Sequence, residues 1–358
     1  MTNEELKRYS RHLLLSEIGK SGQEKLKAAS VLVIGAGGLG CPVLQYLAAA
    51  GVGRIGIIDD DRVDISNLQR QILYTTEDVG LPKATQAKHR LEAQNPFIKI
   101  EAYTERLTPE NCLAHFANFD IIVDGSDNFA TRYLVNDACV ILTKPLVFAS
   151  IFKFEGQVSV FNYKGGPTYR CLFPEPPKEG EVPNCSEIGV LGVLPGIAGS
   201  LQANEVIKLI TGIGEVLSGK LLVFDALSMM FSTLSFSLNP GNTQITTLID
   251  YEVFCETRNE NNSSIRELTI AQLKEKIALN KELELVDVRT KEEFDQFNIG
   301  GRLIPLSELP SHYTSIARDK EVVVFCQTGK RSKSAVEFLK QKGYQKIFTL
   351  KEGLSNWE

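Results

Sequence analysis

Short apolar runs alternate with longer stretches of mixed polarity through the first two thirds of the chain. Residues 31–34 are an apolar run that predicts a buried strand, followed at once by a glycine turn and a helix over residues 39–50. Further strands, the last two antiparallel or mixed, are expected at residues 54–58, 99–103, 119–124, 146–150, 157–162 and 220–224. This alternation predicts an α/β fold with a Rossmann-like mixed sheet.

A polar segment, ETRNENNSS, interrupts this alternation at residues 256–264. Its lack of apolar periodicity is typical of an interdomain linker. A second, smaller α/β pattern follows, with helices and strands expected at residues 270–278, 283–288, 321–325, 331–342 and 346–350. We therefore predict a first domain over residues 1–255, a linker over 256–264 and a smaller α/β domain over 265–358.

Composition and charge narrow the class of protein. The chain has 358 residues, of which 43% are hydrophobic and 23% charged, and its net charge is −5. An acidic chain of ordinary composition argues against nucleic acid as a direct partner. We expect no membrane span and no signal peptide, because no apolar run is long enough. The seven cysteines have no paired spacing, which indicates a reducing, cytoplasmic location.

Gly35, Gly37 and Gly40 stand in G-x-G-x-x-G spacing directly after the first strand. Such a turn lets a nucleotide phosphate approach backbone N–H groups at the start of a helix. Asp59 follows the second strand, 19 residues after Gly40, where a carboxylate suits the hydroxyl groups of a ribose. Many nucleotide-binding folds share this pattern, so it leaves the kind of nucleotide open.

Polar residues cluster in the stretch DISNLQRQIL, where Asn67, Gln69, Arg70 and Gln71 lie close together. Arginine binds phosphate through two parallel hydrogen bonds, so Arg70 is a candidate phosphate ligand. From its own neighbourhood alone, Arg11 fits a solvated helix face.

Two further charged residues stand at predicted helix starts. Lys83 lies in the first turn of the helix after Pro82, where the helix dipole disfavours a cation, so we expect an anion nearby. Asp127 follows a strand at the edge of the sheet where α/β folds bind ligands. It fits either a ligand of Mg²⁺ or the cap of a helix starting at Asn128, and the residues alone leave both open.

A second chemical site is predicted around Cys326 in VVVFCQTGKRS. The strand delivers the cysteine into a short turn before a helix near Arg331, and the turn's backbone N–H groups form an anion-binding nest. Nest, helix start and two basic residues, Lys330 and Arg331, stabilise a thiolate. Because only four residues separate Cys326 from Arg331, the cradle suits a persulfide better than a phosphate.

These motifs resemble a known family. The residues G-x-G-G-L-G, the strand end at Asp59, SNLQRQ, GLPK and SDN resemble the MoeB/ThiF/HesA group of ubiquitin-activating-enzyme-like adenylyltransferases over about residues 4–250. The residues DVR at 287–289, IGGRLIPL and CQTGKRS resemble a rhodanese domain. The combination resembles fused activating and sulfurtransferase proteins, so we expect an ATP-binding adenylyltransferase domain followed by a rhodanese-like domain.

The resemblance implies a role for individual residues. Gly38 lies in the phosphate turn, Asp59 binds the ribose of ATP, and Asp127 organises Mg²⁺ and the triphosphate. Arg70 is also expected to reach the active site of a partner subunit in a homodimer. The other residues expected to contact nucleotide or neutralise its phosphates are Arg11, Ser66, Asn67, Leu68, Gln69, Lys83 and Asn128.

The resemblance also implies a reaction. The substrate is the C-terminal Gly-Gly carboxylate of a small ubiquitin-like sulfur carrier of the MoaD/ThiS type, which is adenylated by ATP with Mg²⁺. A persulfide on Cys326, supplied by an upstream donor such as a cysteine desulfurase, then gives the carrier a thiocarboxylate. Molybdopterin cofactor biosynthesis is the favoured pathway, with thiamine biosynthesis and tRNA thiolation left open.

Three positions bear on this resemblance. Relatives commonly carry two C-x-x-C pairs for structural zinc, but here only Cys171 remains of them, so we predict no zinc site. Asn298 replaces the usual histidine of the rhodanese H-I-x-G-A segment. Cys185 falls where fused relatives have a cysteine that forms a thioester or disulfide, and its covalent role stays open.

Two other functions remain alternatives. A nicotinamide-dependent oxidoreductase fits the glycine turn and Asp59 equally well, but leaves Arg70, Lys83 and the Cys326 loop without a role. A non-catalytic scaffold for a ubiquitin-like partner fits the domain fusion, but not a magnesium carboxylate beside phosphate-binding cations.

Overall fold

A computed structural model describes residues 1–177, 189–255, 266–279, 283–355 and 357. The chain divides into two compact units, Met1–Arg258 and Asn259–Glu358. The predicted linker at residues 256–264 and the candidate Cys185 lie outside the described residues. Each unit is therefore described by itself.

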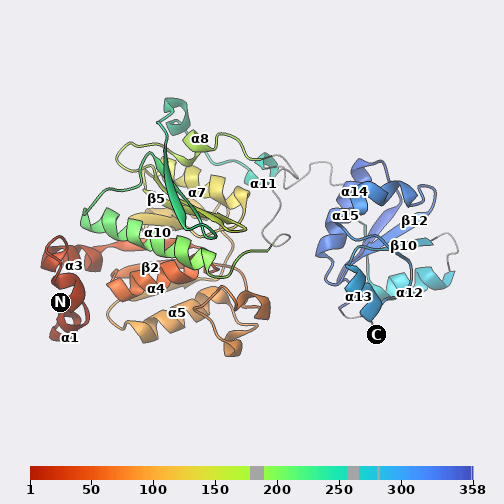
Figure 1. Ribbon diagram of the computed structural model, residues 1–358, viewed down its shortest axis with the longest axis horizontal. Helices are drawn as coiled ribbons and strands as arrows, with labels where there is room; N and C mark the ends of the chain where they lie inside the picture. Colours follow the sequence, from red (N-terminus) through yellow and green to blue (C-terminus); the bar gives the residue numbers. More distant parts are fainter. Residues whose placement is uncertain (178–188, 256–265, 280–282, 356, 358) are drawn as a thin grey trace. The chain divides into compact units, whose positions relative to one another are not determined.

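The first unit is built on one mixed sheet (Figure 1). Within the described residues it has eight strands in the order β3-β2-β1-β4-β5-β6-β7-β8. The strands from β3 to β5 are parallel to their neighbours, and β6 to β8 continue the sheet antiparallel. The strands are β1 (Ser30–Ile34), β2 (Arg54–Ile58), β3 (Lys99–Tyr103), β4 (Ile121–Asp124), β5 (Leu146–Phe152), β6 (Glu155–Phe161), β7 (Lys220–Asp225) and β8 (Met230–Ser235).

Helices cover both faces of this sheet because successive residues of each buried strand point to opposite sides. Val31 and Val33 of β1 face a core shared with α3, α4, α5 and α10, whereas Leu32 and Ile34 face α6 and α7. The helices of the unit are α1 (Asn3–Arg8), α2 (Ser10–Leu13), α3 (Gly19–Ala28), α4 (Gly40–Ala50), α5 (Lys83–Gln94), α6 (Cys112–Ala117), α7 (Phe129–Ile141), α8 (Tyr169–Leu172), α10 (Leu194–Thr211) and α11 (Tyr251–Phe254). The predicted Rossmann-like mixed sheet is thus confirmed.

The second unit is a smaller parallel sheet with the strand order β11-β10-β12-β13-β9 among the described residues. Its strands are β9 (Arg266–Leu268), β10 (Leu283–Asp287), β11 (Arg302–Leu303), β12 (Glu321–Phe325) and β13 (Ile347–Leu350). Its helices are α12 (Ile270–Leu279), α13 (Lys291–Gln296), α14 (Leu309–His312) and α15 (Lys330–Gln341). The predicted smaller α/β domain is confirmed.

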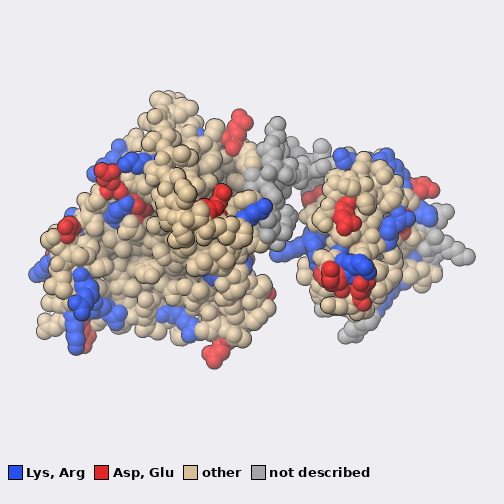
Figure 2. All heavy atoms as spheres, viewed as in Figure 1, with Lys and Arg blue, Asp and Glu red and all other residues tan. Residues whose placement is uncertain are grey.

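The surface of both units mixes charges of both signs. On the face shown in Figure 2, lysine and arginine side chains alternate with aspartate and glutamate over a largely uncharged surface. Within the described residues, none of the helices combines the length and apolar content needed to cross a bilayer.

The order of the strands places a crevice in the first unit. Strand β1 lies between β2 and β4, so the connections that leave β1 and β4 diverge at their carboxyl ends. Open α/β sheets bind ligands at such a point. The glycine turn leaves β1 here, and the Asp127 loop leaves β4 at the same edge.

Candidate active site

A cavity of about 760 Å³ opens at this edge of the first sheet. Its wall is formed by the ends of the parallel strands and the turns that follow them. Eight of the residues predicted for nucleotide binding line it: Gly38, Asp59, Ser66, Gln69, Arg70, Lys83, Asp127 and Asn128. The fold therefore gathers most of the predicted site in one place.

The glycine turn is closed so tightly that side chains cannot enter it. Gly35 has φ +89°, and a Cβ on Gly40 would lie 2.0 Å from the carbonyl oxygen of Gly35. Only glycine fits at these positions. The turn leads into α4, so its backbone N–H groups lie at a helix start, which is the arrangement that binds phosphate.

Asp59 is fixed by the turn that it faces. One carboxylate oxygen accepts the N–H of Ala36 at 2.7 Å, and the other accepts the N–H of Asp61 at 2.8 Å. Burial raises the pKa of Asp59, while these hydrogen bonds and the charge of Lys83 oppose that rise. The carboxylate is thus held in one orientation in the cavity wall.

Lys83 lies in the first turn of α5, as predicted, and the protein itself provides an anion for it. Its Nζ lies 2.8 Å from Oδ2 of Asp61, and the lysine side chain is 6% exposed whereas the aspartate is 70% exposed. The unfavourable position in the helix dipole is therefore offset within the chain. A buried lysine beside an exposed carboxylate can still exchange that partner for a phosphate.

The helix after β4 begins with Asn128. Its side chain accepts the N–H of Thr131 at 2.8 Å, so Asn128 is the cap of α7. The alternative that Asp127 caps this helix is therefore wrong. Asp127 lies exposed in the cavity wall, where a carboxylate is available to a cation.

The structure does not bring every predicted residue into the cavity. Arg11 lies in α2, and neither it nor Asn67 nor Leu68 is part of the cavity wall. Asn67 instead closes a turn with the backbone of Asp64. Arg70 lines the cavity of its own chain and donates to the carbonyl oxygen of Ser66 at 3.0 Å.

Sequence reasoning missed two residues at this site. Arg132 lines the cavity and is 9% exposed, and Asp124 lies beneath it at the end of β4. The pattern that identified Lys83, a cation in the first turn of a helix, could also have identified Arg132. Asp124, the other acid at the end of this strand, also stands where open α/β sheets bind ligands, but it was assigned no role.

The residues that line the cavity fit a nucleotide triphosphate and a magnesium ion. Backbone N–H groups at a helix start, a lysine and an arginine are phosphate ligands, and a cavity-facing aspartate is the type of ligand that Mg²⁺ takes. The chemistry of this donor set agrees with the sequence prediction.

Cys171, the one cysteine left of the pairs that the resemblance associates with zinc, lies in a hydrogen-bonded turn. The Sγ of Cys171 accepts the backbone N–H groups of Thr168 at 3.4 Å and Asn239 at 3.3 Å. Burial raises the pKa of Cys171, but the hydrogen bonds from Thr168 and Asn239 outweigh it, so the pKa is lowered overall. Among the residues that the structure describes, no three His, Cys, Asp or Glu side chains form a cluster able to hold a metal.

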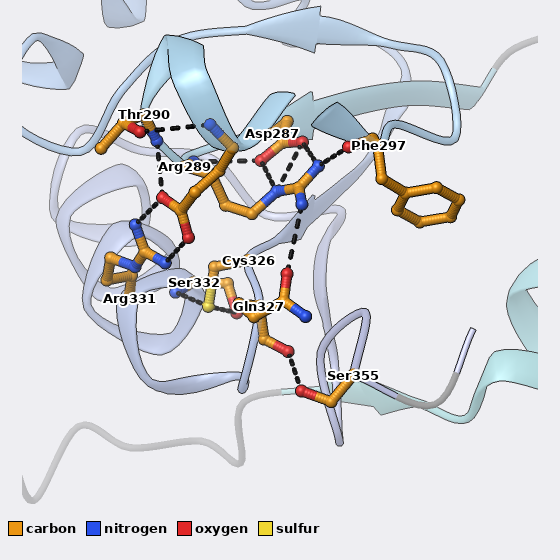
Figure 3. A network of polar contacts seen from close by, with 10 residues as sticks. Asp287, Arg289, Thr290, Phe297, Cys326, Gln327, Arg331, Ser332 and Ser355 are labelled. Carbon is orange, nitrogen blue, oxygen red and sulfur yellow. Dashed lines mark hydrogen bonds and ion pairs between the residues drawn. The ribbon is translucent and has the colours of Figure 1, made fainter. Parts of the chain in front are cut away.

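The second site lies in the second unit, at the end of β12. Cys326 follows Phe325 and is completely buried. Gly329 has φ +86° and begins α15, and the N–H of Ser332 points to the Sγ of Cys326 at 3.4 Å. The predicted arrangement of strand, cysteine, curled loop and helix is present (Figure 3).

Two arginines surround this loop, and both are engaged by carboxylates (Figure 3). Arg289 is buried, pairs with Asp287 at 2.7 Å and donates to the side chain of Gln327 at 3.2 Å. Arg331 makes a two-pronged pair with Glu293, with N–O distances of 2.7 and 2.6 Å. The positive field expected from Arg331 is therefore partly neutralised, and sequence reasoning missed this carboxylate.

The side chain of Asn298 makes local hydrogen bonds with the backbone. It accepts the N–H of Gly300 at 3.2 Å and donates to the carbonyl oxygen of Phe294 at 3.1 Å. The asparagine thereby closes the turn between α13 and β11. The loop of Cys326 is built by other residues.

Family models match nearly the whole chain. The model described as "ThiF family" matches residues 9–245, and the model described as "Rhodanese-like domain" matches residues 269–358. The chain belongs to the ThiF family. The resemblance stated from its motifs is confirmed, and this ThiF-family chain also carries a rhodanese-like domain.

Two of the relatives match the chain over nearly its whole length, and a third matches most of it. A protein of Mycobacterium tuberculosis named "Probable adenylyltransferase/sulfurtransferase MoeZ" is 46% identical, covering 100% of this chain and 94% of the relative. The "Sulfur carrier protein adenylyltransferase" of Thermus thermophilus is 55% identical over 72% of this chain and 99% of its own length. The "Probable molybdopterin-synthase adenylyltransferase" of Porphyra purpurea is 41% identical over 99% of this chain and 93% of its own.

Solved structures of the ThiF fold are similar too. The crystal structure of E. coli MccB with ATP has a TM-score of 0.58 and 25% identity, and covers 67% of this chain and 73% of that protein. A further crystal structure of E. coli MccB has the same TM-score of 0.58 and covers 68% of this chain.

Proposed function

We propose that this protein adenylates the C-terminal carboxylate of a ubiquitin-like sulfur carrier and then transfers sulfur to it from a persulfide on Cys326. The observation that carries the proposal is the cavity in which the glycine turn, Arg70, Lys83 and Asp127 meet. The names of two relatives, which combine adenylyltransferase and sulfurtransferase, support both halves of the reaction.

In the first step, a carboxylate oxygen of the carrier attacks the α-phosphorus of ATP, the bond to the bridging oxygen breaks, and pyrophosphate leaves. Lys83 and Arg70 stabilise the negative charge that spreads over the phosphates. Asp59 orients the ribose, and the glycine turn holds the phosphates at the start of α4. Asp127, beside Asn128, would hold Mg²⁺, which supplies further charge neutralisation when bound.

In the second step, the outer sulfur of the Cys326 persulfide attacks the acyl carbon and AMP leaves. The carrier is then joined to Cys326 through a disulfide. Attack of a second thiol on the Sγ of Cys326 forms a new disulfide between that thiol and Cys326, breaks the acyl disulfide and releases the thiocarboxylate. Cys185 is the thiol that the family resemblance offers for this attack. An external thiol then reduces the new disulfide and restores both cysteines.

The first step is tested by exchange of labelled pyrophosphate into ATP in the presence of candidate carriers. We expect exchange that requires both a carrier and Mg²⁺, and we expect Asp127→Ala to lower it by about 10²–10³-fold. Asp319→Ala removes an exposed carboxylate of the second unit and serves as the control. Unchanged exchange in Asp127→Ala would contradict the mechanism.

The second step is tested with Cys326→Ser. The hydroxyl cannot form a persulfide, so we expect loss of thiocarboxylate, measured as a mass change of the carrier, with normal pyrophosphate exchange. Cys255→Ser alters another buried thiol and is expected to keep both steps. Thiocarboxylate formed by Cys326→Ser would show that sulfur arrives by another route.

We further propose a homodimer in the cytoplasm, supplied with sulfur by a donor such as a cysteine desulfurase. Molybdopterin cofactor biosynthesis is the pathway that we favour, because one relative of nearly full length is named a molybdopterin-synthase adenylyltransferase. The choice of pathway is tested by mixing the protein with the carriers of molybdopterin biosynthesis, thiamine biosynthesis and tRNA thiolation. Mass spectrometry then shows which carrier has gained an adenylate or a thiocarboxylate.

A further inference from the structure

Arg132 is a buried cation in the wall of the cavity. It stands in the first turn of α7 and is 9% exposed. Its guanidinium carbon lies 5.4 Å from the ring centre of Phe129 and 5.5 Å from that of Phe148. Aromatic rings on two sides hold a guanidinium through cation–π attraction and restrict its motion. The side chain is therefore held in place before any substrate arrives.

The charge of Arg132 is incompletely matched by the protein. Its Nε has no hydrogen-bond partner, and within the described part of the chain no carboxylate lies within 4.0 Å of its guanidinium nitrogens. The nearby Asp124 uses one oxygen for Ser126, while its Oδ2 has no partner. Burial raises the pKa of Asp124, which weakens it as a counter-charge.

Two other cations of the cavity have carboxylate partners. Lys83 pairs with Asp61, and Arg106 pairs with Glu252 at 2.7 Å. Arg132 interacts with the hydroxyl of Tyr169 and with the charge of Asp124, but no carboxylate forms an ion pair with it among the described residues. A buried charge without such a pair is costly unless a ligand supplies one. Arg132 therefore has the properties expected of a ligand-binding cation, and the ligand must be an anion.

The position in the sheet indicates which anion this is. The phosphate turn follows β1 and Asp59 follows β2, whereas the proposed Mg²⁺ ligand Asp127 follows β4 together with Asn128. Arg132 follows β4, and Phe148 beside it belongs to β5, whose Ile151 also lines the cavity. The peptide tail has to reach the α-phosphorus, and the side of β4 and β5 is the one at which Arg132 and Ile151 line the cavity without an assigned nucleotide contact.

We propose that Arg132 binds the C-terminal carboxylate of the peptide substrate and presents it to the α-phosphorus. The planar guanidinium matches a carboxylate with two parallel hydrogen bonds. The inference rests on the proposed adenylation and adds to it a binding residue for the peptide. In this proposal Arg132 binds the carrier tail, whereas other residues of the cavity bind ATP.

The experiment compares a carrier that supports pyrophosphate exchange with the same carrier ending in a carboxamide. Binding of both is measured by calorimetry to the full-length protein in the presence of a non-hydrolysable ATP analogue. We expect the unmodified protein to bind the carboxylate form about tenfold or more tightly than the amide. Arg132→Met, which keeps length and aromatic contact, is expected to bind both forms within about twofold.

Binding of the ATP analogue alone provides the matched control. Arg132→Met is expected to keep its affinity for the nucleotide, whereas Lys83→Met is expected to lose it. Thermal unfolding checks that each variant is folded. If Arg132→Met does not fold, Arg132→Lys keeps the charge without the planar fork, and its preference for the carboxylate should fall between the other two.

Two outcomes separate the proposals. If the unmodified protein exchanges pyrophosphate but the Arg132 variants still distinguish carboxylate from amide, the role of Arg132 is overturned and the adenylation stands. If the unmodified protein exchanges pyrophosphate with none of the carriers, the adenylation and the role of Arg132 fall together.

Discussion

Lys83 and Arg331 each have a carboxylate within hydrogen-bonding distance, although they belong to different sites. Lys83 pairs with Asp61 in the first unit, and Arg331 pairs with Glu293 in the second. In both pairs the carboxylate comes from another element, so the pairing depends on the fold. These partners set how much positive charge each site offers to a ligand.

The pair of Glu293 and Arg331 makes stability depend on pH. The hydrogen bonds from Arg331 lower the pKa of Glu293 to about 2, from an ordinary value of 4.5. A carboxyl with a lowered pKa contributes stability above about pH 4.5, and that contribution is lost as the pH falls towards 2. Because the pair is partly exposed, we expect Glu293→Gln to cost only about 1 kcal/mol at pH 7.

Urea unfolding at pH 7, 4 and 3 measures this effect. The difference between the unmodified protein and Glu293→Gln should shrink as the pH falls. Asp295→Asn, which alters an exposed pair with Lys291, should change stability by less than about 0.5 kcal/mol. A difference that stays constant with pH would contradict the pairing.

Individual residues differ in how far the sequence could predict them. Asp59, Lys83 and Asp127 were found because each stands at a predicted strand end or helix start, where position alone indicates chemistry. Asp61 and Glu293 were missed as partners, since the residues that they pair with lie 22 and 38 positions away. Long-range pairing is fixed by tertiary structure, so local patterns do not reveal it.

At the scale of elements, the glycine turn between β1 and α4 requires a very close approach of backbone to backbone. A Cβ on Gly40 would lie 2.0 Å from the oxygen of Gly35. We expect Gly40→Ala to destabilise the first unit by about 3 kcal/mol and to abolish ATP binding, because the turn has to open. Urea unfolding and calorimetry with ATP measure the two effects.

Gly196→Ala is the matched control for this substitution. Gly196 lies in α10, and a Cβ there would meet nothing within 4 Å. Alanine should therefore leave stability unchanged or raise it by up to about 1 kcal/mol. Equal losses in the two variants would show that the contact with Gly35 is not the cause.

A second element-level prediction concerns the turn at Cys171. Thr168 and Asn239 donate hydrogen bonds to its sulfur, so the turn is held without a metal ligand set. We expect EDTA to leave the melting temperature unchanged and elemental analysis to give no stoichiometric zinc. About one zinc per chain, together with destabilisation by the chelator, would contradict this prediction.

The elements themselves were largely predictable. The strands predicted from apolar runs coincide closely with β1 to β7, because buried parallel strands are almost continuously apolar. The short β9 (Arg266–Leu268) and β11 (Arg302–Leu303) were not predicted. Strands of two or three residues carry too few apolar positions to form a pattern, and only their neighbours in the sheet define them.

At the scale of the whole molecule, the two units have separate cores. The core around Val31 and Leu44 contains residues of the first unit alone, and the core around Val324 and Leu339 contains residues of the second. We expect two unfolding transitions in scanning calorimetry. ATP with Mg²⁺ should raise the temperature of only one transition. At an ATP concentration 100 times the dissociation constant, the free energy of unfolding of that unit should rise by about 2.7 kcal/mol.

Asp127→Ala provides the control for this experiment. It should unfold in the same two transitions but respond less to ATP, since a ligand of Mg²⁺ is missing. A shift of both transitions by ATP in the unmodified protein would contradict separate cores. The sequence anticipated this division from the polar segment at residues 256–264, whose own structure lies outside the described residues.

The complete enclosure of the Cys326 sulfur has a consequence for the speed of the enzyme. If Cys326 receives sulfur as proposed, a donor cannot reach its Sγ while the Cys326 loop covers it, so each delivery has to wait until that loop opens. Increasing the amount of donor then accelerates the cycle only up to the frequency of this movement. When loop opening limits the rate, donors of different reactivity would give the same turnover rate.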